Sequence, residues 1–131
     1  MRKTFEPQLR LGTTPIQEVK IPLKSRHEVA AVARALQAVY CNPEVSTKIF
    51  AILSAIIIGN KKQTGRNGMD LWYILVLGVL RLATNASYDE LEHYANFDSL
   101  IRQIMGIENS FDVHRITFTR NSLHDNISCR F

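Results

Sequence analysis

The chain has 131 residues, of which 46% are hydrophobic, and a formal net charge of +4. A chain of this length and hydrophobicity forms a single domain with a sizeable core, which excludes a wholly disordered protein. Its two cysteines are too few for a disulfide framework and indicate a reducing cytoplasm. The charge is unevenly distributed: residues 1–66 hold eleven Lys/Arg against four Asp/Glu, whereas residues 67–131 hold five against eight.

Residues 1–24 are predicted to form an extended arm that contains one short strand. In "EVKIPLK", residues 18–24, apolar and polar side chains alternate, which is typical of a half-buried strand. Pro22 has no N–H for a sheet ladder, so this strand would lie at an edge. Ser25 and Glu28 then form a capping box, which predicts the start of the first helix.

A second helix is predicted to begin at Asn42-Pro43, where Asn is a good N-cap and Pro suits the first helical position. It is expected to run to about Gly59. From residue 49 to residue 58 it is apolar on nearly all faces, so most of its sides must be covered. This run and the one at residues 71–80 are each about ten residues long, and a membrane span needs about 20, so no membrane partner is expected.

The remaining signals define a helical domain over residues 25–107. They are Asp70, Ser87 with Glu90, and Asp98 as helix starts, and Gly106 as a left-handed stop. Residues 108–131 form a C-terminal segment, in which Ser122 is expected to cap a last helix. The predicted fold class is therefore mostly α, a compact bundle of about five helices with a helix-turn-helix-like corner at its end and a short N-terminal edge strand.

The three helices at residues 70–84, 88–95 and 99–105 have helix-turn-helix proportions. On the last of them, Ser99, Arg102 and Gln103 lie off the apolar face, and we expect them to contact DNA bases. The local pattern alone fits an ordinary corner of a bundle at least as well.

Basic side chains supply candidates for phosphate contacts. Those in the loop "KKQTGR" are Lys61, Lys62 and Arg66, and those after the bundle are Arg115 and Arg120. The basic front half favours a polyanionic partner, because Lys and Arg bind phosphates irrespective of base sequence. The alternative for the loop is a solvated connector.

The sequence gives no case for a metal site, a cofactor, a small-molecule substrate or a catalytic centre. The spacing of His93, His114, His124 and Cys129 matches no zinc pattern. No serine lies on a nucleophile elbow.

The run "GRNGMDLWYILVLGVLRLATNASYDELEHYANFDSLIRQIMGI", residues 65–107, resembles the N-terminal domain of bacterial insertion-sequence transposases of the DDE class. In that family a Gly-Arg loop leads into an apolar helix, a Ser-Tyr-acid-Glu-Leu helix follows, and a short helix closes on a Leu- or Met-Gly-apolar stop. Here these elements are Gly65-Arg66, residues 71–83, "SYDEL" and "MGI". The stretches "PIQEVKIPLKSRHEVAAVARALQAVY" and "HRITFTRNSLHDNIS" are similar to one subgroup.

The resemblance implies a helical domain that binds transposon ends, followed by a catalytic domain in which three acids hold two divalent metal ions. This chain ends in "CRF", where a relative continues into that second domain. We therefore expect a truncated, non-catalytic, DNA-binding fragment of a transposase. Two alternatives stay open: a protein-interaction module that pairs with itself or with a full-length transposase, and a gene remnant without a function.

Overall fold

The computed structural model describes residues 16–22, 24, 26–57, 69–107 and 117–127. These residues form six α-helices and one 3-10 helix, so the prediction of a mostly helical fold is confirmed. In chain order the elements are η1 (Ile16–Glu18), α1 (Glu28–Cys41), α2 (Pro43–Ile57), α3 (Leu71–Thr84), α4 (Tyr88–Phe97), α5 (Ser99–Met105) and α6 (Arg120–Ile127).

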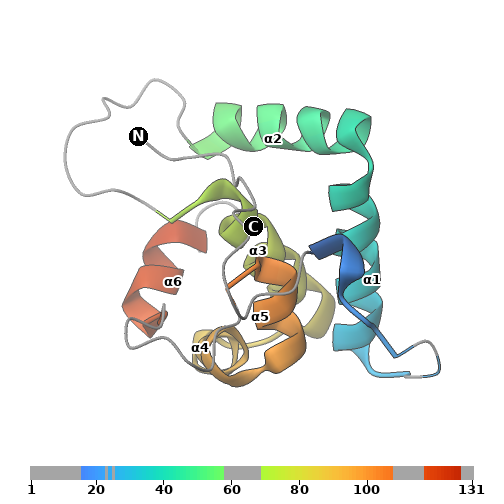
Figure 1. Ribbon diagram of the computed structural model, residues 1–131. Helices are drawn as coiled ribbons and strands as arrows, with labels where there is room; N and C mark the ends of the chain where they lie inside the picture. The colour runs from blue at the N-terminus through green and yellow to red at the C-terminus, as the bar shows by residue number, and fades with distance from the viewer. Residues whose placement is uncertain (1–15, 23, 25, 58–68, 108–116, 128–131) are drawn as a thin grey trace.

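Helix α3 is the centre of the bundle. It contacts α1, α2, α4, α5 and α6, and Figure 1 shows it behind α5, with α1 to the right, α2 across the top, α4 below and α6 to the left. Eight of its 14 residues are buried. A helix that is apolar on most faces is stable only when neighbours cover it, and five helices pack around α3.

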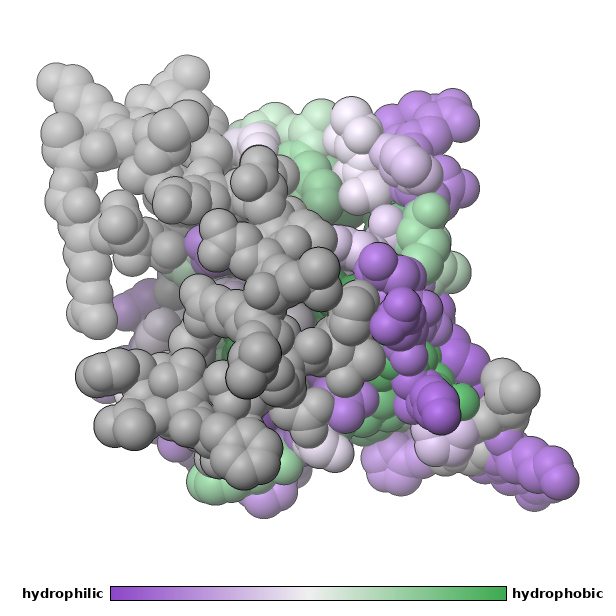
Figure 2. Space-filling view, viewed as in Figure 1, coloured by the Kyte–Doolittle hydropathy of each residue, from purple (hydrophilic) through white to green (hydrophobic). Residues whose placement is uncertain are grey.

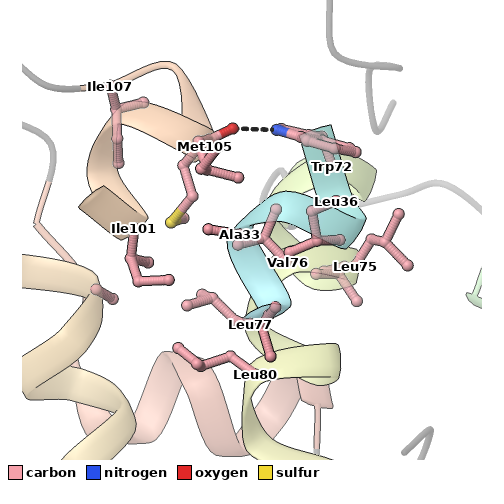
Figure 3. Close-up of a cluster of buried hydrophobic side chains, with 14 of the residues drawn as sticks. Ala33, Leu36, Trp72, Leu75, Val76, Leu77, Leu80, Ile101, Met105 and Ile107 are labelled. Carbon is pink, nitrogen blue, oxygen red and sulfur yellow. Dashed lines mark hydrogen bonds between the residues drawn. The ribbon is translucent and has the colours of Figure 1, made fainter. Parts of the chain in front are cut away.

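Figure 3 shows the core between α1, α3 and α5. Buried side chains from these three helices meet there, among them Ala33, Leu77 and Ile101. At its edge the indole Nε1 of Trp72 donates a hydrogen bond of 2.9 Å to the carbonyl oxygen of Ile104. Because both groups are buried, this bond satisfies two polar atoms that water does not reach, and it fixes α5 against α3.

The starts of α2 and α3 agree with the sequence prediction, whereas the start of α1 does not. Asn42 and Asp70 are confirmed as the residues before α2 and α3, although Asp70 makes no side-chain capping bond. The prediction that Ser25 caps α1 is wrong. The N-cap of α1 is His27, whose Nδ1 accepts a 3.2 Å hydrogen bond from the amide of Val29.

The expected edge strand is replaced by a different structure in the described residues 16–22. They form η1 and an irregular stretch, and Ile16 and Val19 lie buried in the core. The side-chain amide of Gln37 on α1 donates 2.9 Å hydrogen bonds to the carbonyl oxygens of both Ile16 and Val19. A helix side chain therefore satisfies the backbone groups for which the alternating pattern predicted a neighbouring strand.

The last helix begins earlier than predicted. Helix α6 starts at Arg120, and Thr119 caps it: the Thr119 hydroxyl accepts a 3.2 Å hydrogen bond from the amide of Ser122. Phe118, Leu123 and Ile127 belong to the same core as the other helices. Residues 16–22 and 117–127 thus pack against the helices of residues 26–57 and 69–107.

Helix α2 is the least enclosed helix of the bundle. In the described part of the chain it contacts only α1 and α3, and Leu53 is the one buried residue that the structure describes on it. The expectation that most of its sides are covered is therefore wrong. At the α1–α2 corner the rings of Tyr40 and Phe50 lie 5.4 and 6.2 Å from the ring of Trp72. Partial burial raises the pKa of Tyr40, and the charge of the Cys41 thiolate raises it further.

None of the described helices is both long enough and apolar enough to cross a membrane.

Candidate nucleic-acid interface

The corner between α4 and α5 is formed by a single residue. Asp98 is the C-cap of α4, where its amide donates to the Tyr94 carbonyl oxygen at 3.2 Å. It is also the N-cap of α5, where its Oδ1 accepts a 3.0 Å hydrogen bond from the amide of Ile101. With no linker between the two helices, the angle between them depends on the backbone of Asp98. This confirms the predicted start of α5.

The other two predicted boundaries of the corner are also confirmed. The Ser87 hydroxyl accepts a 3.2 Å hydrogen bond from the amide of Glu90 at the start of α4. Gly106 has φ 75° and ends α5, with its amide bonded to the Gln103 carbonyl oxygen and the next amide, of Ile107, bonded to that of Arg102. This is the Schellman arrangement, which favours glycine because a left-handed backbone disfavours a Cβ.

Arg102 does not point into solvent. Its side chain is 3% exposed, with Nη1 donating to the Ala95 carbonyl oxygen at 2.8 Å and Nη2 donating to the Ile107 carbonyl oxygen at 3.3 Å. The guanidinium thus joins the last turn of α4 to the end of α5. The prediction that Arg102 contacts bases is wrong for this structure, because its donors are used inside the fold.

The two other predicted base contacts remain accessible. Ser99 is exposed at the first residue of α5, and Gln103 is half-buried one turn later. A Gln side chain has the donor and acceptor pair that reads adenine, and a Ser hydroxyl contacts any base. This leaves a smaller polar surface on α5 than the sequence predicted.

Of the five predicted phosphate contacts, four lie outside the described residues: Lys61, Lys62, Arg66 and Arg115. The fifth, Arg120, begins α6, and its side chain is 62% exposed. Its Nε lies 3.2 Å from Oδ1 of Asp89 on α4. An exposed ion pair of this kind is weak, so a phosphate can compete with Asp89 for the guanidinium.

The structure brings two further groups close to Tyr88, the first residue of α4. The guanidinium of Arg81, in the last turn of α3, lies over the Tyr88 ring at 4.8 Å from its centroid, and the His124 ring of α6 contacts it edge-on at 5.1 Å. The Nε of Arg81 is buried and makes no hydrogen bond. Sequence reasoning missed Arg81 and His124 as members of one surface, because 43 residues separate them.

We call Arg81, Tyr88, Arg120 and His124 the α3–α6 cluster. It joins two arginines, an imidazole and a phenol, all of which donate hydrogen bonds to phosphate oxygens. Acidic side chains adjoin it, since Asp89 and Glu90 are exposed in the first turn of α4. The two arginines therefore offer individual hydrogen-bond donors, and the surface around them does not have a large positive electrostatic potential.

Most of the excess positive charge lies outside the described residues. Of the 16 Lys/Arg and 12 Asp/Glu of the chain, eight cations and nine acids are in the described residues, which leaves eight cations and three acids elsewhere. The described residues together carry a formal charge of −1, and the whole chain carries +4. Non-specific attraction to a polyanion thus depends on the remaining segments.

Asn96 is a structural residue that the sequence pattern did not reveal. Its Nδ2 donates to the carbonyl oxygen of Phe118 at 2.8 Å, and its Oδ1 accepts from the amide of Phe118 at 2.7 Å. These two buried bonds fasten the segment before α6 onto α4. They hold Arg120 and His124 close to Tyr88.

The histidines do not converge on one point where the structure describes them. His93 contacts the rings of Tyr94 and Phe97, and His124 contacts Tyr88, whereas His114 and Cys129 lie outside the described residues. Within residues 16–22, 24, 26–57, 69–107 and 117–127, no three His, Cys, Asp or Glu side chains are grouped to hold a metal ion.

No protein-family model, curated protein or solved structure gives a significant match to the chain. The resemblance of residues 65–107 to transposases is therefore a prediction that rests on the quoted motifs alone.

Proposed function

We propose that this protein binds DNA as the N-terminal, end-recognising part of a transposase, acts in the cytoplasm on the nucleoid, and does not itself cut DNA. The observation that carries the proposal is the α3–α6 cluster, in which Arg81 and His124 contact Tyr88 and Arg120 pairs with the next residue, Asp89. The motifs of residues 65–107 and the exposed Ser99 and half-buried Gln103 on α5 support it.

The roles of the acids agree with binding rather than cleavage. Asp98 accepts the amide hydrogen bond that starts α5, and Asp89 pairs with Arg120. These two carboxylates lie at the start of α5 and in the first turn of α4 and have different partners. A two-metal nuclease centre needs acids that converge on the same ions.

Titration of a fluorescent DNA duplex with the full chain at several salt concentrations tests the proposal. We expect binding that weakens steeply between about 50 mM and about 200 mM salt, with each phosphate contact contributing about 0.9 to the slope of log affinity against log salt. Arg81→Ala and Arg120→Ala should each reduce the slope by about 0.9. Lys48→Ala is the matched control, because Lys48 is an exposed cation on α2 that pairs with Glu44.

The same duplexes, incubated with magnesium, report on cleavage. Nicking by the isolated chain would contradict a non-catalytic role, and the absence of binding in dilute buffer would contradict DNA binding altogether.

Selection from random duplexes tests whether the chain recognises a particular DNA sequence, as end recognition requires. An enriched sequence that the Gln103→Ala variant no longer prefers supports base readout by α5. Uniform affinity for all sequences would remove the transposon-end role.

A second candidate function is a protein-interaction module that regulates transposition by pairing with itself or with a full-length transposase. The exposed apolar side chains of α2, Val45, Ile52 and Ile56, favour it. The oligomeric state in the absence of DNA separates this candidate from the first.

A further inference from the structure

Helix α2 carries a regular line of apolar side chains on its open side. Val45, Ile52 and Ile56 are 38%, 59% and 57% exposed, and Ile49 between them is half-buried. We call these four residues the α2 seam. Their spacing of four, three and four residues is that of the a and d positions of a coiled coil, so the side chains lie along one stripe of the helix.

The α2 seam flanks the side of the helix that faces the bundle, and Ile49 of the seam also packs against the core. Leu53 is buried, and the Phe50 ring lies 6.2 Å from that of Trp72. At about 100° per residue, Leu53 lies roughly 80° and Phe50 roughly 140° around the helix from Val45, so the exposed stripe is turned sideways from the bundle. In Figure 2 green atoms cover part of α2 at the top of the view, bounded on the right by purple atoms.

We propose that the α2 seam docks against the α2 seam of a second copy of this chain, with the two helices antiparallel and related by a two-fold axis. This proposal specifies both the partner and the surface for the second candidate function, in which the chain pairs with itself. The proposed dimer does not depend on DNA binding. Large apolar side chains exposed in a row at helical spacing are typical of an interaction site rather than of scattered surface residues.

The spacing of the seam identifies the partner. A four-three-four series reads the same in both directions, so an antiparallel copy superposes the seam on itself, with Val45 opposite Ile56 and Ile49 opposite Ile52 of the other copy. Such self-complementarity is what a two-fold interface requires, since each contact then occurs twice.

The charges on α2 agree with the antiparallel orientation. Lys48 borders the seam, and its Nζ lies 3.5 Å from Glu44 Oε1 of the same helix. In an antiparallel pair this end of one helix meets the uncharged Ala55–Ile56 end of the other, so like charges do not oppose each other. In a parallel pair the two Lys48 side chains would lie at the same level. A neutral, apolar surface also fits poorly to nucleic acid.

Sedimentation of the full chain without DNA, from about 1 μM to about 1 mM, measures the pairing. We expect a concentration-dependent monomer–dimer equilibrium in which Ile52→Glu raises the dissociation constant at least about tenfold, because it places a carboxylate in the apolar contact. Leu82→Glu is the control. Leu82 is 61% exposed on α3, outside the seam, and its substitution should change the constant less than about twofold.

Far-UV circular dichroism shows whether Ile52→Glu still folds, as its exposure leads us to expect. If it does not, Ile56→Glu, at an equally open position, replaces it. A wild-type chain that stays monomeric throughout the range would overturn the proposal. So would a dimer that Ile52→Glu and Leu82→Glu weaken equally, or one that neither weakens.

Cross-linking determines the orientation. In a Cys41→Ser, Cys129→Ser background, a short bis-maleimide should join Val45→Cys chains to Ile56→Cys chains in a mixture. It should leave Val45→Cys alone uncross-linked, because the two copies of residue 45 would lie about 16 Å apart along the pair. Efficient cross-linking of Val45→Cys to itself would indicate a parallel pair and overturn the antiparallel assignment. DNA titration of Ile52→Glu is expected to match the wild type, which separates this outcome from that of the DNA proposal.

Discussion

Helix α5 has seven residues and α2 has fifteen, yet the shorter helix is the more firmly incorporated. Four residues of α5 are buried, and it is joined to its neighbours through Asp98, Arg102 and the Trp72 indole. Helix α2 is attached through its start at Asn42 and through Leu53, and its other side is open. The burial of a helix in this bundle depends on how many helices surround it and on its hydrogen bonds to their backbones. Neither the length of the helix nor its hydropathy predicts this burial.

The largest expected effect is at the α4–α5 corner. Arg102→Met keeps most of the side-chain volume and removes both bonds to the carbonyl oxygens of Ala95 and Ile107. The free energy of unfolding should fall by about 3 kcal/mol, because buried acceptors lose a charged donor. Urea denaturation followed by circular dichroism measures this. Gln103→Met, one residue along, is the control, and an equal loss in both variants would show that Arg102 does not hold the corner.

The attachment of α6 should give the next effect. Asn96→Ala removes the two buried bonds to Phe118, which should lower the free energy of unfolding by about 2 kcal/mol. The amide of Phe118 should also exchange with solvent faster, since it then lacks its acceptor. His93→Ala, an exposed position on the same helix, provides the comparison. Unchanged exchange at Phe118 would mean that α6 is held by its apolar side chains alone.

On α2 the contrast lies between neighbouring positions. Leu53→Ala should cost about 2 kcal/mol of stability, at the low end for a buried leucine because few elements surround it. Ile52→Ala should change monomer stability by less than about 0.5 kcal/mol. Thermal or urea unfolding at low protein concentration measures both. Similar losses at the two positions would indicate that the bundle covers the seam.

The smallest effect is expected at the exposed pair of Arg120 and Asp89. A double-mutant cycle with Arg120→Ala and Asp89→Ala should give a coupling free energy below about 0.5 kcal/mol, and salt should reduce it further. A coupling several times larger would show that the pair is structural, and Arg120 would then be a poor candidate for a phosphate contact.

The elements that the sequence predicted well are those that depend on neighbours in the chain. Asn42, Ser87, Asp98 and Gly106 act on amides or carbonyls within five residues, so a local pattern reveals them. The helical content follows from the capping residues and the apolar runs for the same reason.

The errors involve partners that are distant in the chain or hidden by packing. Arg102 lies off the apolar face of α5, and nothing local shows that Ala95 and Ile107 cover it. The alternation of apolar and polar side chains in residues 18–24 fits a strand. The carbonyl oxygens of Ile16 and Val19 instead accept hydrogen bonds from the side chain of Gln37 on α1. The α3–α6 cluster depends on contacts that are distant in the chain, among them the bonds by which Asn96 fixes Phe118 across 22 residues.

Trp72 is the only tryptophan of the chain, and its surroundings make it a built-in optical reporter. Its indole belongs to α3, donates to a carbonyl of α5, and lies beside aromatic rings from α1 and α2. Emission from this single fluorophore therefore senses whether these four helices come apart in one step or whether α2 separates first. A blue-shifted spectrum that moves to the red before the ellipticity falls would reveal a loosened α2 on an otherwise intact protein.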